Sequence, residues 1–218
     1  MIRLALPGWI MVQAEVAAFE ILTLAASYFG TTDLAAQSVL ATLSAITFQI
    51  PFPISIASST RIANLIGATL ADAAKVQARV VGCVAIMVGM FNMIMLLSLR
   101  SVIPRLFTSD KEVIAIVSDV IPVMAAFQLF DSLACNCNGI LRGLGRQEIG
   151  GYVQLIAYYG VAMPISIGTA FGTQWKLHGL WAGVATALFL VSLVEGILIY
   201  RIDWERSVEE ARIRNERG

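Results

Sequence analysis

Residues 80–99 read VVGCVAIMVGMFNMIMLLSL, a run that contains no charged side chain. At a rise of about 1.5 Å per residue, a helix of this length spans the hydrocarbon core of a bilayer, which is about 30 Å thick. The run does not alternate between apolar and polar residues, as a strand of a membrane barrel does. It therefore predicts a membrane helix, which satisfies its own backbone hydrogen bonds.

Polar segments divide the chain into six such apolar stretches. We place them at residues 4–29, 34–60, 78–99, 113–140, 149–171 and 178–200. The composition agrees, because 58% of the residues are hydrophobic and 14% are charged, which in a soluble protein would leave large exposed apolar patches. The sequence therefore predicts an all-α integral membrane six-helix bundle at residues 1–204, followed by a charged cytoplasmic tail at residues 205–218.

The basic residues predict the orientation of the bundle. With six spans, one side of the membrane holds both termini, the loop between the second and third spans and the loop between the fourth and fifth. Most of the basic residues lie on that side: Arg3, Arg61, Lys75, Arg79, Arg142, Arg146, Arg201, Arg206, Arg212, Arg214 and Arg217. The other side holds Arg100, Arg105, Lys111 and Lys176. This imbalance predicts that both termini are cytoplasmic. Because acids and bases balance over the chain, nothing points to a nucleic-acid partner.

Prolines interrupt several of the spans. Pro51 and Pro53 lie near the middle of the second span, Pro122 lies in the fourth and Pro164 in the fifth. Each proline removes a backbone donor and favours a kink. Bent helices are typical of a bundle that lines a cavity, although simple helix irregularity also explains such prolines.

Three acids are predicted to lie at membrane depth, where an ionisable side chain costs about 2.5 kcal/mol or more. Glu15 and Glu20 belong to the first span and Asp131 to the fourth. From the helical rise, Glu15 and Asp131 lie about 16 Å and about 15 Å from the cytoplasmic side. Glu20 lies about 7.5 Å further outward and about 140° around the helix from Glu15. These three residues are the candidate substrate-binding or ion-coupling site.

Polar residues recur around these acids at helical spacings. Gln13, Glu20 and Ser27 repeat every seven residues in the first span, and a second stripe follows the fourth span: Gln128, Asp131, Cys135 and Asn138. We expect both stripes to face the interior of the bundle, with Gln13, Gln128 and Asn138 as supporting groups. Buried carboxyls can carry protons or bind Na⁺, and the alternative is that they stay protonated and bridge helices by hydrogen bonds.

Other polar residues are expected to be structural. Glu195 and Asp119 lie near span ends and can reach the interface, and Arg61 and Asn64 are expected to act as interfacial anchors. The spans contain no further Lys or Arg that would pair with the acids. His178 is the only histidine, and the cysteines have no ligand spacing. We therefore expect no enzyme, no metal site and no cofactor.

Five stretches of the sequence are similar to segments of one known family. They are Pro7–Glu20, DLAAQSVL at Asp33–Leu40, RIANLIGA at Arg61–Ala68, IPRLFTSDKEV at Ile103–Val113 and FQLFDSLACNCNGILRGLGRQEIG at Phe127–Gly150. The last stretch is long enough to be specific. The sequence resembles the C-terminal lobe of the eukaryotic MATE transporters, the multidrug and toxic compound extrusion family, with Pro7–Glu20 similar to the family's seventh helix, and we expect a fungal member.

The resemblance implies one lobe of a twelve-helix antiporter that expels organic cations or other xenobiotics in exchange for H⁺, with Na⁺ as the less favoured ion. The family's acids of the seventh helix correspond to Glu15 and Glu20, and the acid of its tenth helix corresponds to Asp131. Animal members carry glutamate at that last position. They also carry aromatic residues after the first glutamate, where this chain has Val16, Ala17 and Phe19.

The resemblance covers six of the family's twelve or more helices. We expect a truncated version of a longer protein, and otherwise a lobe that works with the missing N-terminal lobe or with a second copy of the chain. The plasma or vacuolar membrane is the expected location. The alternatives are an isolated, non-transporting lobe that binds or regulates another protein, and a lipid flippase, against which the lack of interior Lys or Arg counts.

Overall fold

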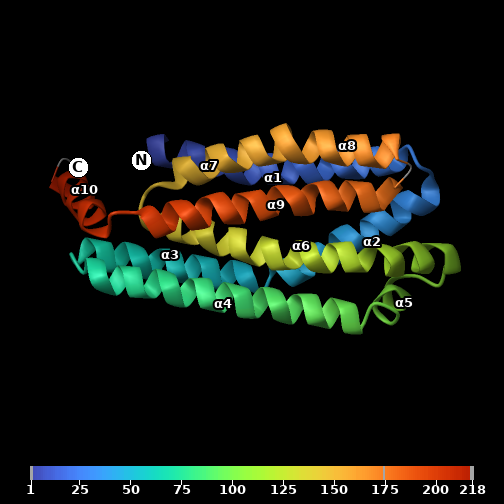
Figure 1. Ribbon diagram of the computed structural model, residues 1–218, viewed down its shortest axis with the longest axis horizontal. Helices are drawn as coiled ribbons and strands as arrows, with labels where there is room; N and C mark the ends of the chain where they lie inside the picture. Colours follow the sequence, from blue (N-terminus) through green and yellow to red (C-terminus); the bar gives the residue numbers. More distant parts are fainter. Residues whose placement is uncertain (1, 174, 217–218) are drawn as a thin grey trace.

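The computed structural model describes the backbone of residues 2–173 and 175–216, and the side chains of residue 13 and of residues 16–173 and 175–213. This part of the chain is helical and contains no strand (Figure 1). The helices, in chain order, are α1 (Ile2–Ser27), α2 (Thr31–Phe48), α3 (Pro51–Gly67), α4 (Ala71–Ser98), α5 (Ile103–Phe107), α6 (Lys111–Gly143), α7 (Gln147–Leu155), the π-helical segment η1 (Ile156–Ala162), α8 (Met163–Gly172), α9 (Lys176–Arg201) and α10 (Trp204–Glu216).

The six predicted spans correspond to helices or to broken helices. Within the described residues, five helical segments are long and apolar enough to cross a membrane: Thr31–Gly67, Ala71–Ser98, Lys111–Gly143, Gln147–Gly172 and Lys176–Arg201. The first span is α1, whose described apolar part, Val16–Ser27, is shorter. The prediction of an all-α membrane bundle is confirmed, and α5 is a short addition in the loop before α6.

At two of the prolines for which a kink was predicted, Pro51 and Pro164, the structure has an irregularity in the span. The second span stops at Phe48 and resumes as α3 with Pro51 in its first turn, where a missing N–H leaves no hydrogen bond unmade. The fifth span widens into η1 just before Pro164, since a proline removes one rung of the helical hydrogen-bond ladder. Pro122, in contrast, lies inside a continuous α6.

Helix α6 lies at the centre of the bundle, and α2, α3, α4 and α9 pack around it (Figure 1). Small residues let the backbones approach closely, as is typical of membrane bundles. A Cβ at Gly143 of α6 would lie 2.7 Å from the carbonyl oxygen of Ser59 in α3. The hydroxyl of Ser132 donates to the carbonyl oxygen of Ala85 in α4 at 2.8 Å.

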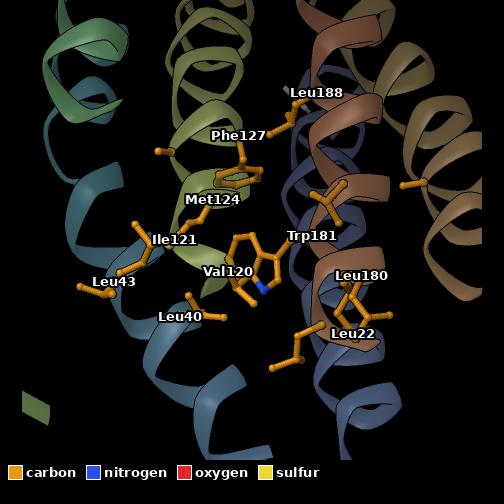
Figure 2. Close-up of a cluster of buried hydrophobic side chains, with 14 of the residues drawn as sticks. Leu22, Leu40, Leu43, Val120, Ile121, Met124, Phe127, Leu180, Trp181 and Leu188 are labelled. Carbon is orange, nitrogen blue, oxygen red and sulfur yellow. The ribbon is translucent and has the colours of Figure 1, made fainter. Parts of the chain in front are cut away.

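A cluster of large side chains fills the space between α1, α2, α6 and α9 (Figure 2). Trp181 of α9 projects toward α6, and its indole nitrogen donates to Oε1 of Gln37 in α2 at 3.0 Å. Its ring lies 5.3 Å from that of Phe127, which in turn lies 6.0 Å from the ring of Phe19 in α1. The T-shaped contacts join α1, α6 and α9, and the hydrogen bond joins α2 to α9, so together they fix the four helices relative to one another.

The charged segment after the last span forms α10, which packs Trp204 and Ala211 against the ends of α3 and α4. Arg146, in the connection between α6 and α7, donates to Glu210 at 2.9 Å. This hydrogen bond and the charge of Arg146 lower the pKa of Glu210 from its ordinary value of 4.5. The start of α1, the turn between α3 and α4, and α10 lie at the same end of the bundle (Figure 1).

Candidate functional site

A cavity of about 580 Å³ opens between α1, α2, α3 and α6, and α7 and α9 contribute to its wall. Its lining is largely apolar and includes four aromatic side chains: Phe19, Phe48, Phe52 and Phe127. Phe48 and Phe52 flank the break between α2 and α3, and their rings lie 5.4 Å apart. The broken second span therefore supplies an aromatic corner of the cavity.

Two of the three predicted acids border this cavity. Glu20 reaches it from α1 and is exposed, whereas Asp131 reaches it from α6 and is only 3% exposed. The side chain of the third acid, Glu15, lies outside the described residues. The fold therefore brings together two carboxyl groups that are separated by more than a hundred residues in the sequence.

The polar stripe of α6 faces the cavity as expected and continues further than expected. Asp131, Cys135 and Asn138 line the cavity, and so does Arg142, one helical turn after Asn138. Arg142 was counted as a loop residue, but α6 continues to Gly143, so this arginine lines the same cavity as the acids. Arg142 follows Asn138 by four residues, and this spacing could have identified it from the sequence as part of the same helix face.

The other predicted polar residues lie elsewhere. Gln128 is fully buried and is not part of the cavity wall, and neither carboxamide atom has a hydrogen-bond partner among the side chains that the structure describes. Gln13, Glu20 and Ser27 of the first span are all exposed, and Glu20 borders the cavity. Helical spacing gives these residues a common face but does not identify the neighbour that covers it.

The sequence analysis did not single out Gln154 and placed Glu195 incorrectly; both residues are buried. Gln154 of α7 is 4% exposed and lines the cavity. Glu195 was expected to reach the interface, but it is fully buried. The correction has a geometric reason: the face of α9 that carries Glu195 also carries Leu188 and Val191, both buried, so the carboxyl points into the bundle and not toward lipid headgroups.

A second cavity, of about 550 Å³, lies at the opposite end of the bundle between α2, α6 and the start of α9. Lys176 donates to the buried carboxylate of Asp33 at 3.1 Å, and Nε2 of His178 lies 3.3 Å from Oδ2 of Asp119. The carboxylate of Asp119 is exposed, in keeping with its predicted interfacial place. Each carboxylate of this cavity thus lies beside a nitrogen atom of α9. We call the first cavity, which Glu20 and Asp131 border, the acidic cavity.

Comparison with known proteins agrees with this architecture. The model of the MatE family matches residues 7–167, which is well over half of the chain. The chain belongs to this family. Relatives include an uncharacterized transporter of Schizosaccharomyces pombe, 39% identical over 96% of this chain, and multidrug and toxin extrusion protein 2 of Mus musculus, 38% identical over 97%. The named members are transporters and not enzymes.

The similarity also extends to three dimensions. The crystal structure of the eukaryotic MATE transporter AtDTX14 is 31% identical and superposes with a TM-score of 0.89, covering 97% of this chain and 48% of that one. The two relatives named above are covered over 39% and 37% of their lengths. This chain therefore corresponds to about half of a MATE transporter, and its helices form a multi-pass integral membrane protein.

Proposed function

We propose that this chain acts as the C-terminal half of an H⁺-coupled exporter of organic cations or other amphipathic xenobiotics. One observation carries the proposal: carboxyl groups from two different helices, Glu20 and Asp131, border one cavity whose lining is largely apolar and includes four aromatic rings. A cavity of this kind suits a cationic amphipathic solute, since carboxylates balance its charge and aromatic faces attract it. The name of the mouse relative, multidrug and toxin extrusion protein 2, supports the same substrate class.

The two acids divide the work according to their burial. A charge on the buried Asp131 is costly unless a proton or a substrate cation accompanies it, so the two ligands compete for this carboxyl. Glu20 is exposed to the cavity and can pass protons between Asp131 and water. Proton binding then releases the substrate, and substrate binding releases the proton. Glu15 is proposed as the third member of this set.

The proposed partner is the N-terminal lobe, or a second copy of this chain. Glu20 and Gln13 lie on a face of α1 that the described helices leave uncovered, which supports a partner on that side. We further propose that the end carrying α10 is cytoplasmic, in the plasma or vacuolar membrane. The basic residues Arg61, Lys75 and Arg146 lie in or near the connections at that end, as the positive-inside tendency requires.

The test is substrate efflux from proteoliposomes that contain the chain together with an N-terminal lobe of the family. An imposed pH gradient should drive efflux of a fluorescent organic cation, and an equal Na⁺ gradient should not. Glu20→Gln and Asp131→Asn should each abolish this efflux. The matched control is Glu112→Gln, an exposed acid on the same helix as Asp131, which should leave efflux unchanged.

Two results would contradict the proposal. Efflux that persists in Asp131→Asn would remove the acid pair from the coupling mechanism. Substrate binding without any flux, in the presence of each partner, would favour the alternative of a lobe that binds or regulates and does not transport.

A further inference from the structure

A second group of polar side chains lies between α6, α7 and α9, at the wall of the acidic cavity. It consists of Glu195, Asn138 and Gln154, which are 0%, 5% and 4% exposed. Both carboxyl oxygens of Glu195, Oδ1 of Asn138 and Oε1 of Gln154 have no hydrogen-bond partner within the described part of the chain. All four atoms are acceptors, and leaving a buried acceptor unpaired costs about 1–3 kcal/mol.

Gly150 of α7 brings two of these oxygens together. A Cβ at this glycine would lie 2.5 Å from Oδ1 of Asn138 and 3.5 Å from Oε1 of Glu195. The two oxygens are therefore separated by no more than the sum of these distances, about 6 Å. Gln154 follows Gly150 by four residues and so lies on the same face of the helix. The absence of a side chain at Gly150 leaves room for this convergence.

The orientation of Asn138 is fixed by its own helix. Its amide nitrogen donates to the carbonyl oxygen of Ala134 at 3.0 Å. Rotating the carboxamide by 180° would place two acceptors against each other, so Oδ1 must point toward Gly150. The group therefore presents carbonyl and carboxylate oxygens to one another, which is the arrangement of ligands that a hard cation requires.

We propose that Glu195, Asn138 and Gln154 bind a monovalent metal cation, Na⁺, at a site separate from Glu20 and Asp131. One carboxylate and two neutral carboxamides carry a single negative charge, so a monovalent ion leaves the buried group neutral, whereas a divalent ion leaves it positive. The hard cation Ca²⁺ takes oxygen ligands at about 2.3–2.6 Å. Oδ1 of Asn138 and Oε1 of Glu195, at most about 6 Å apart, can contact one ion from opposite sides after a small side-chain shift.

A proton alone satisfies this group less completely. Protonated Glu195 supplies one donor, which pairs one of the remaining acceptors and leaves two without a partner. A cation contacts all of them at once. Asn138 and Gln154 also line the acidic cavity, which provides the ion with a path from water. A bound ion would tie α7 to α6 and α9.

Arg142 offers a competing occupant. It lies one turn after Asn138 on α6 and lines the same cavity, so its guanidinium could reach into the group in place of a metal ion. The two arrangements give opposite results in a binding experiment, because Arg142 and Na⁺ exclude each other from a site with one negative charge.

The experiment measures binding of radioactive sodium to the full chain in lipid nanodiscs, at fixed pH and at constant ionic strength maintained with choline. We expect saturable binding of one Na⁺ per chain and a Tm that rises with Na⁺ to a plateau. Glu195→Gln should weaken binding at least tenfold. Gly150→Ala should also weaken it, since the new Cβ displaces Asn138, and this variant keeps the charge of the site. Glu112→Gln is the matched control and should bind as the unaltered chain does.

Several outcomes would overturn the proposal. Binding that is unchanged in Glu195→Gln, or a Tm that responds equally to choline and Na⁺, would show that the group holds no sodium. Loss of binding in Asp131→Asn but not in Glu195→Gln would assign the ion to the acidic cavity. Binding that emerges only in Arg142→Gln would show that the guanidinium occupies the site. None of these readouts needs transport, so they stand apart from the test of the exporter.

Discussion

Two glycines of α4 provide a matched test of how tightly this bundle is packed. Gly89 faces α6, and a Cβ there would lie 2.9 Å from Cδ1, 3.0 Å from Cα and 3.1 Å from the carbonyl oxygen of Leu129. Gly82 lies two helical turns earlier, and nothing lies within 4 Å of the Cβ that it would carry. The change from glycine to alanine is therefore chemically identical at both positions and differs in what the methyl group meets.

The size of the effect follows from this difference. Gly82→Ala should stabilise the protein by about 0.5–1 kcal/mol or less, since alanine is the better helix former. Gly89→Ala carries the same gain, but its Cβ forces α4 and α6 apart, and such overpacking costs about 1–3 kcal/mol. The backbone of Leu129 cannot move aside as a flexible side chain can. The propensity gain cancels between the two variants, so their free energies of unfolding should differ by about 1–3 kcal/mol.

The assay is reversible unfolding in mixed micelles with increasing denaturing detergent, followed by tryptophan fluorescence. Trp181 reports directly on the core, because its indole is buried and bonded to Gln37. The midpoint for Gly89→Ala should fall below that of the unaltered chain, and that for Gly82→Ala should not. Free energies of unfolding that agree within about 0.5 kcal/mol for the pair would refute the close approach of α4 and α6.

Two further predictions concern single polar contacts. Trp181→Phe should lower the free energy of unfolding by about 1–3 kcal/mol, because it leaves Oε1 of Gln37 buried without its donor. Combining it with Gln37→Leu should recover part of this loss. Unfolding is followed here by circular dichroism, since the fluorescent reporter is the residue replaced. Docking of α10 against the bundle should weaken at acidic pH. Arg146 lowers the pKa of Glu210 in the folded protein, so their ion pair contributes only while Glu210 is ionised. The contribution should be complete above pH 4.5, the ordinary pKa of this carboxyl, and should be lost as the pH falls through the lowered pKa. Cleavage of α10 by an acid-active protease should then increase with falling pH, and Glu210→Gln should be cleaved with no such dependence. A pH response that survives in Glu210→Gln would assign it to another group.

The sequence predicted the helices better than the site. Continuous apolar runs and the prolines at positions 51 and 164 are local features, and the spans and breaks follow them closely. Glu20 and Asp131, which border the cavity, were also singled out, because a carboxyl in an apolar run is conspicuous. Arg142 and Gln154 were not, since each lies near the end of an apolar run, where polar residues are expected and attract no notice.

The placement of Glu195 shows most clearly what sequence could not decide. The position of a residue along a helix depends on the rise per residue and can be counted from the chain, so the sequence by itself determined where the apolar helices run. The direction in which a side chain points depends on which helix packs against that face, and the neighbours of Glu195 on α6 and α7 are far from it in the sequence. Only the tertiary structure decided that Glu20 is open to the cavity while Glu195 is enclosed, because an apolar helix can bury its faces equally well against lipid or protein.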